Sequence, residues 1–128
     1  AASLGRTWRR SWSLSREWRL YVADMKACCE RVTQYTSGLS REEFENRRMA
    51  YDATLRNLEL LGEAARHVPD EVRALAPDIP WRRIVGVRNI LIHGYLGIDN
   101  DIIWDIVRNE IAPLRKSLEK LEAIANRP

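Results

Sequence analysis

The segment RNILIHGY, residues 88–95, places polar side chains that can act on a phosphate at regular intervals in an apolar stretch. A histidine accepts and donates protons near neutral pH, and His93 could therefore act as a general base or acid. Arg88 offers a permanently charged, planar set of donors for a phosphate or a charged transition state. Asn89 could orient an imidazole or bind a ligand amide, and Tyr95 adds a hydroxyl.

These residues share a surface if the segment is helical. At about 100° per residue, Asn89 and His93 lie on one stripe and Arg88 and Tyr95 on the neighbouring stripe. All four side chains then meet in one patch, provided that the helix continues to Tyr95. A structural role is the alternative, because a histidine near a helix C-terminus also stabilises free carbonyls and an arginine on a helix flank is usually solvated.

The elements that would position this patch are helical. Ser15 is a candidate N-cap, and Ser40 with Glu43 forms a capping box for a short helix that Arg47 and Arg48 extend. Pro80 suits the first turn of the helix that carries the patch, and Gly94 ends that helix. The apolar stripes at helical spacing are Trp18, Val22, Met25, Cys29, Val32; then Tyr51, Leu55, Leu58, Gly62, Ala65; then Ile84, Val87, Leu91; and finally Ile103, Ile106, Val107, Ile111, Leu114, Leu118, Leu121 and Ala125.

Strand signals are almost absent, since no alternating run and no Asn-Gly or Asp-Gly hairpin occurs. Connections are short, residues 69–80 contain one short helical turn, and Pro113 lies inside the last helical pattern and is expected to kink it. The sequence therefore predicts an all-α, antiparallel helical bundle of four main helices plus one or two short ones.

Length and charge limit the function classes. The chain has 128 residues, which is enough for one domain, and 21 Lys and Arg against 18 Asp and Glu. Arg6, Arg9 and Arg10 account for this excess, so residues 15–128 are neutral overall. A broad electrostatic nucleic-acid surface is therefore excluded, and any RNA contact must come from a local site.

Cysteine usage and hydropathy narrow the classes further. Cys28 and Cys29 are adjacent and cannot form a standard disulfide with each other, which favours a reducing, cytoplasmic compartment. No apolar run is long enough for a membrane span. The two cysteines with His67 and His93 have no zinc-ligand spacing, so we expect neither metal nor cofactor.

Residues 1–14 differ from the rest in having no acid and in carrying Trp8 and Trp12. We expect them to be an N-terminal extension, either an upstream remnant or a basic arm whose indoles contact a neighbour or stack on bases. Residues 15–128 are expected to form the domain.

Arg88, His93 and Tyr95 form the pattern R-x4-H-x-Y. With the stretches SREWRLYVADM, YDATLRNLELLGEAARHVP and IPWRRIVGVRNILIHGYLGIDNDIIWDIV, it resembles the HepT-like members of the HEPN superfamily over nearly the whole chain from Ser15 on. The resemblance implies a homodimer whose two motifs face each other across a cleft, and a metal-independent endoribonuclease that acts as a toxin. It also implies a cognate MntA-like minimal nucleotidyltransferase as antitoxin, which transfers AMP to Tyr95.

Other polar residues are candidates for supporting roles. Asn57 and Glu63 interrupt an apolar helix, and a helix flank with one hydrogen-bonded polar group is the simpler explanation for them. The alternative is that one of them orients Arg88 or His93. Asp99 and Asp101 are explained by helix capping, and Trp81 and Trp104 by core or dimer contacts.

Two further functions remain open on the sequence alone. The chain could be a non-catalytic, nucleotide-binding partner and substrate of a minimal nucleotidyltransferase, in which the motif serves to present Tyr95. It could also be a helical dimer with a degenerate site.

Overall fold

The chain is all-α, as the periodicity predicts. The computed structural model describes the backbone of residues 2–94 and 97–125, and the side chains of residues 17–92, 94 and 97–124. Within these ranges there is no β-strand. The helical elements are α1 (Ala2–Thr36), α2 (Arg41–Asn46), α3 (Arg48–Arg66), α4 (Asp70–Arg73), α5 (Trp81–His93), α6 (Asn100–Asp105), the π-helical turn η1 (Ile106–Glu110) and α7 (Ile111–Ala125).

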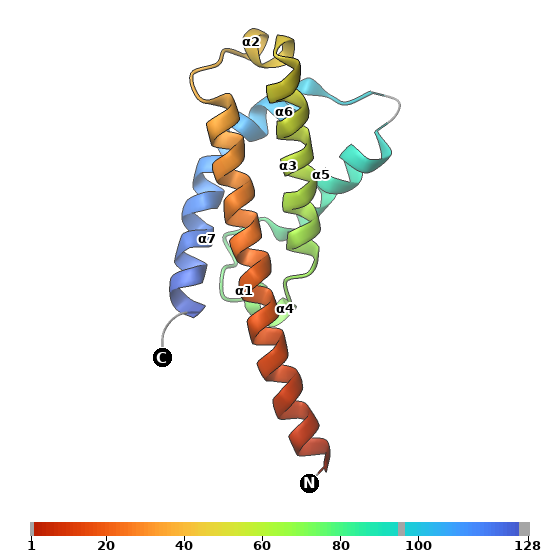
Figure 1. Cartoon of the computed structure of the whole chain (residues 1–128), viewed down its shortest axis with the longest axis vertical. Helices are drawn as coiled ribbons and strands as arrows, with labels where there is room; N and C mark the ends of the chain where they lie inside the picture. Colours follow the sequence, from red (N-terminus) through yellow and green to blue (C-terminus); the bar gives the residue numbers. More distant parts are fainter. Residues whose placement is uncertain (1, 95–96, 126–128) are drawn as a thin grey trace.

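The four long helices run alternately up and down (Figure 1). α1 packs against α3 on one side and α7 on the other, and α5 packs against α3. The N-terminal part of α1 extends beyond the other helices in Figure 1. Among the described residues, no helix is both long and apolar enough to cross a membrane.

The predicted apolar stripes form the core. On α1, the stripe from Trp18 to Val32 is fully buried. On α3, Leu58 and Ala65 are buried while Tyr51 and Leu55 are half-buried. The stripe of the last helix is also buried, at Ile103, Ile106, Ile111, Leu114, Leu118 and Leu121.

Local capping signals are confirmed where the chain turns. Ser40 accepts a hydrogen bond from the Glu43 backbone N–H, and the Glu43 carboxylate accepts one from the Ser40 N–H. Asp99 caps α6 by accepting a hydrogen bond from the backbone N–H of Asp101. Capping therefore accounts for the Asp99 carboxylate, whereas the Asp101 carboxylate pairs with Arg41.

Two predicted helix boundaries are wrong. α1 begins at Ala2 and continues through Ser15, which therefore does not cap a helix. Serine is tolerated inside helices, and a cap forms only where the backbone leaves helical geometry. Arg47 does not extend α2, because its extended backbone (φ −90°, ψ 93°) separates α2 from α3. The division into residues 1–14 and 15–128 stays a prediction.

The last helix departs from α geometry in the turn ahead of Pro113. In η1, the backbone N–H of Ile111 donates to the carbonyl of Ile106, five residues back instead of four. Pro113 has no N–H for the carbonyl of Asn109, and a proline inside a helix weakens the preceding turn. The predicted irregularity at Pro113 is therefore a π-helical turn just before it.

Candidate active site

Arg88 lies on α5 where that helix meets α3. Its Nε is 2.5 Å from Oε2 of Glu63, and its Nη1 donates a 3.3 Å hydrogen bond to Oδ1 of Asn89. The Arg88 side chain is 23% exposed. The Nε contact is an ion pair without hydrogen-bond alignment and the Nη1 contact is a hydrogen bond, so two of the three nitrogens have partners. Within the described part of the chain Nη2 has no protein partner.

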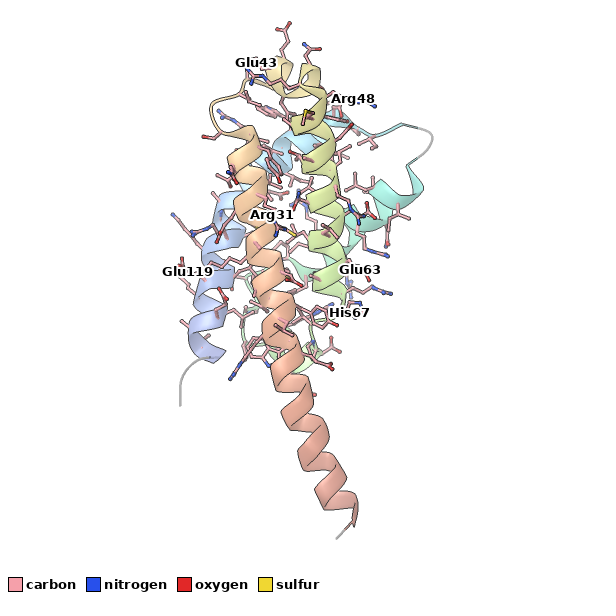
Figure 2. The ribbon with its side chains drawn as sticks, viewed as in Figure 1. Arg31, Glu43, Arg48, Glu63, His67 and Glu119 are labelled. Carbon is pink, nitrogen blue, oxygen red and sulfur yellow. The ribbon has the colours of Figure 1, made fainter. Side chains whose placement is uncertain are left out.

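Glu63 pairs with this arginine and is itself held by other donors. Figure 2 labels Glu63 and His67 close to each other near the end of α3. Its Oε1 accepts a 3.1 Å hydrogen bond from Nη2 of Arg66 and lies 3.2 Å from Nε2 of His67. The hydrogen bond from His67, followed by Arg66 and the charge of Arg88, holds the pKa of Glu63 below its ordinary value. The carboxylate is therefore ionised near neutral pH and pairs with Arg88.

His67 and Tyr21 also lie beside this site, although the sequence did not indicate either residue. The two rings are stacked, with centroids 4.9 Å apart and planes at 20°. Tyr21 lies on α1 and His67 is the C-cap of α3, so the contact joins residues that are distant in the chain. No local pattern could have predicted it.

His93 and Tyr95 are placed only in part. α5 ends at His93, and Gly94, with φ −85° and ψ 36°, is no longer helical. Arg88, Asn89 and His93 therefore lie on one continuous helix, as the spacing argument requires. The helix ends before Tyr95, so the spacing argument does not apply to that residue. The side chain of His93 and the whole of Tyr95 lie outside the described residues, so their convergence with Arg88 stays a prediction.

Asn57 has other partners than the motif. It accepts a 3.4 Å hydrogen bond from Nη1 of Arg31 and donates one of 2.9 Å to the carbonyl of Ala53. Its side chain is buried in α3. No hydrogen bond joins it to Arg88 in the described structure, so Asn57 links α3 to α1 instead of orienting the arginine.

Trp81 and Trp104 contribute to packing, as predicted. Trp81 is buried and its indole N–H donates to the carbonyl of Ala76. Trp104 is half-buried against the ring of Phe44.

Neither cysteine is a candidate nucleophile. Both thiols are buried. Burial raises the pKa of Cys28 and raises that of Cys29 to about 12, so both stay protonated at neutral pH. Among the described residues, no group of three or more His, Cys, Asp and Glu side chains is placed to hold a metal ion.

Gly62 allows α3 and α5 to approach closely at the candidate site. A Cβ added to Gly62 would lie 2.4 Å from Cβ of Arg88 and 3.0 Å from the carbonyl oxygen of Ile84. Both atoms belong to, or are attached directly to, the α5 backbone, so the overlap cannot be relieved by rotating a side chain. The glycine thus sets the position of Arg88 relative to Glu63.

We expect Gly62→Ala to destabilise the protein, although alanine is the better helix former by about 1 kcal/mol. Overpacking typically costs about 1–3 kcal/mol, which exceeds that gain. Gly86→Ala is the matched control, because a Cβ at this helical glycine of α5 meets nothing within 4 Å and should stabilise the helix. Urea unfolding of both variants measures the difference, and a Gly62→Ala variant as stable as Gly86→Ala would contradict the close approach.

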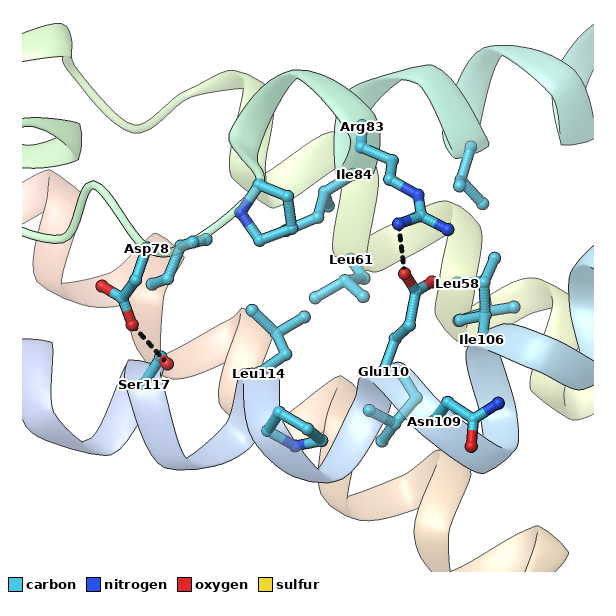
Figure 3. Close-up of a pocket in the computed structure, with 15 residues that line it drawn as sticks. Leu58, Leu61, Asp78, Arg83, Ile84, Ile106, Asn109, Glu110, Leu114 and Ser117 are labelled. Carbon is cyan, nitrogen blue, oxygen red and sulfur yellow. Dashed lines mark hydrogen bonds and ion pairs between the residues drawn. The ribbon is translucent and has the colours of Figure 1, made fainter.

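A separate, mainly apolar groove lies between α5 and α7 (Figure 3). Its volume is about 210 Å³, and its walls include Leu58, Ile84 and Leu114. An ion pair between Arg83 and Glu110 (2.5 Å) and a hydrogen bond from Ser117 to Asp78 (2.9 Å) span the groove. Arg83 is thus engaged here, away from Glu63.

Comparison with known proteins connects this chain to a family. A family model described as "Ribonuclease HepT-like" matches residues 25–121. "Putative RNase MJ1380" of Methanocaldococcus jannaschii is 36% identical over 104 residues, which cover 81% of this chain and 95% of the relative. "Probable ribonuclease HepT" of Thermococcus cleftensis is 32% identical over 108 residues, covering 84% and 98% of the two chains.

A bacterial relative, "Putative RNase TTE0752" of Caldanaerobacter subterraneus subsp. tengcongensis, is 34% identical over 103 residues, covering 80% of this chain and 92% of its own length. No solved structure is similar enough to this chain to count as a match.

Proposed function

The chain belongs to the HepT-like family, and on that premise we propose that it is a metal-independent endoribonuclease whose reaction depends on Arg88 and His93. The observation that supports this proposal most directly is the anchored guanidinium. Arg88 is held by Glu63 and Asn89 and keeps a donor nitrogen without a protein partner in the described structure. The names of the relatives supply RNA as the substrate.

The reaction proposed is an intramolecular transfer. The ribose 2′-oxygen attacks the adjacent phosphorus, the bond from phosphorus to the 5′-oxygen breaks, and a 2′,3′-cyclic phosphate remains. A general base takes the 2′-hydroxyl proton and a general acid protonates the leaving 5′-oxygen. Arg88 stabilises the additional negative charge on the phosphorane with its guanidinium donors.

The chain offers one motif histidine for two proton transfers. A homodimer in which two motifs face each other supplies both, with His93 of one copy as base and His93 of the other as acid. This arrangement is part of the proposal, as the HEPN resemblance implies it.

Regulation by a second protein completes the proposal. We assign the chain as the toxin of a toxin–antitoxin pair, whose cognate MntA-like nucleotidyltransferase transfers AMP to Tyr95. An adenylylated Tyr95, two residues beyond His93, would bring a phosphate next to the motif and compete with RNA for Arg88.

Cleavage of RNA in the presence of EDTA tests the ribonuclease proposal. The full-length protein should cut single-stranded RNA and leave cyclic phosphate ends, which end-group mapping detects. A preparation that binds RNA without cutting it would instead favour the non-catalytic alternative.

Intact mass spectrometry tests the role of Tyr95. Incubation with ATP, Mg²⁺ and the nucleotidyltransferase encoded beside the chain should add the mass of at least one adenylyl group and abolish RNA cleavage. Tyr95→Phe should remain unmodified and stay active in the presence of the partner. Tyr51→Phe is the control and should still be modified, because the Tyr51 hydroxyl is engaged with Asn100 on another pair of helices. An adduct that persists in Tyr95→Phe would place the modification elsewhere.

A further inference from the structure

A cleft between α1 and α3 opens beside the candidate active site. It has a volume of about 340 Å³, which is within the range of small-molecule sites. Its walls include Tyr21, Asp24 and Arg31 from α1, and Glu63 and His67 from α3 and its C-cap. In Figure 2, Arg31, Glu63 and His67 are labelled around the face where these two helices lie side by side. These residues define the α1–α3 cleft.

One wall of the α1–α3 cleft is aromatic. The stacked rings of Tyr21 and His67 both line it, and the His67 side chain is 41% exposed. Cys28 and Ala64 are buried residues that provide an apolar surface between the helices. Unpaired RNA bases bind proteins by stacking on tyrosine, histidine and arginine planes, so this wall suits a flat heterocycle.

The polar edges of the cleft add hydrogen-bonding groups. Asp24 is exposed and has no hydrogen-bond or ion-pair partner among the described residues. An ionised carboxylate only accepts hydrogen bonds, so Asp24 suits a donor on the edge of a base, either an exocyclic amino group or a ring N–H. Arg31, whose Nη1 donates to Asn57, provides a cation at the other end of the cleft.

Glu63 connects the α1–α3 cleft to Arg88. Its side chain lines the cleft, and the same carboxylate holds Arg88 at 2.5 Å. A nucleotide whose phosphate is bound by Arg88 therefore has the cleft within reach of its own base or of the neighbouring one.

From this geometry we propose that the α1–α3 cleft is a nucleobase subsite, which binds a base next to the phosphate at Arg88. The proposal rests on the ribonuclease function proposed above and deepens it, because it names the place where a base of the substrate is bound. Tyr21 and His67 form the stacking surface, and Asp24 accepts a hydrogen bond from a donor on the base edge.

Removal of single bases from the RNA tests the stacking. The full-length His93→Ala protein is used in EDTA so that the RNA stays intact, and each nucleotide around the cleavage site mapped with the wild type is replaced by an abasic one. We expect one abasic position next to the scissile phosphate to weaken binding about tenfold, and adding His67→Ala to reduce that penalty to less than about twofold. Tyr35→Ala, on α1 outside the cleft, is the matched control and should keep the full penalty.

The experiment compares how much affinity is lost when one base is removed, with and without His67. A general loss of affinity in His67→Ala would affect all the RNAs alike and would leave this difference unchanged. An equal penalty in the His67→Ala and Tyr35→Ala backgrounds, or no position-specific penalty at all, would overturn the subsite. A wild-type protein that cuts RNA in EDTA but lacks this pattern refutes the subsite alone. A wild-type protein that cuts no RNA refutes the ribonuclease proposal and the subsite with it.

Asp24→Ala gives a second measurement that does not depend on removing a ring. In the His93→Ala background it should weaken binding of the intact RNA about tenfold, because a hydrogen bond to a charged group is lost. It should change binding of the RNA that is abasic at the mapped position less than about twofold, because that RNA has no base edge to donate to the carboxylate. An equal loss of affinity for both RNAs in Asp24→Ala would contradict the assigned role of the carboxylate.

Discussion

Replacing His93 by alanine is expected to slow RNA cleavage by about 10²–10⁴-fold, the usual contribution of a general acid or base. In a homodimer with two facing motifs, the substitution removes the base and the acid together, so the upper part of this range applies. The rate of single-turnover cleavage, measured in EDTA with protein in excess, reports this loss directly.

Two controls separate chemistry from folding and binding in this experiment. His93→Gln keeps a polar side chain but cannot transfer a proton near neutral pH, so it should be as inactive as His93→Ala. Both variants should bind RNA and unfold thermally like the wild type, because His93 is the last residue of α5. Cleavage by His93→Ala at the wild-type rate would eliminate His93 as the catalytic group.

Arg88→Ala is expected to slow cleavage by about 10²–10³-fold, as is typical when one preorganised donor to a developing charge is lost. Arg88→Lys keeps the positive charge but not the planar pair of donors, so it should retain only part of the activity. Arg88→Ala also removes the partner of Oε2 of Glu63, while Oε1 keeps its hydrogen bonds with Arg66 and His67.

Arg83→Ala is the matched control for Arg88. Arg83 lies on the same helix but pairs with Glu110 across the apolar groove between α5 and α7. Its removal should leave cleavage near the wild-type rate, which shows that loss of a cation from α5 is not itself inhibitory. Equal losses in Arg83→Ala and Arg88→Ala would indicate a general charge effect and contradict the specific role of Arg88.

The fold was predictable because its signals are local. The stripe from Trp18 to Val32 recurs at helical spacing, and all of it is buried in the structure. The Ser40–Glu43 box depends on residues three positions apart, and it forms as expected. The pairing of Glu63 with Arg88 was one of two readings that the sequence allowed, because both residues interrupt apolar faces of helices.

Features that depend on contacts between distant segments were not predictable. The α1–α3 cleft exists because Tyr21 and His67 meet across two helices, and neither residue has a distinctive neighbourhood in the sequence. The extended backbone of Arg47 likewise carries no glycine or proline signal. At Gly62 the sequence shows only a small residue in a core stripe. The structure shows why a larger one does not fit, since an added Cβ would lie 2.4 Å from Cβ of Arg88.

The π-helical turn η1 changes which residues of the last helix face the core. Ile106 and Ile111 are both buried although they are five positions apart in the chain. In a regular α-helix their side chains would point about 140° apart. The wider turn absorbs one surplus residue and returns the helix to its register on the core. The segment 107–110 thus holds a one-residue insertion within a helix, and removing one residue there would leave both halves of the apolar stripe facing inward at ordinary α spacing.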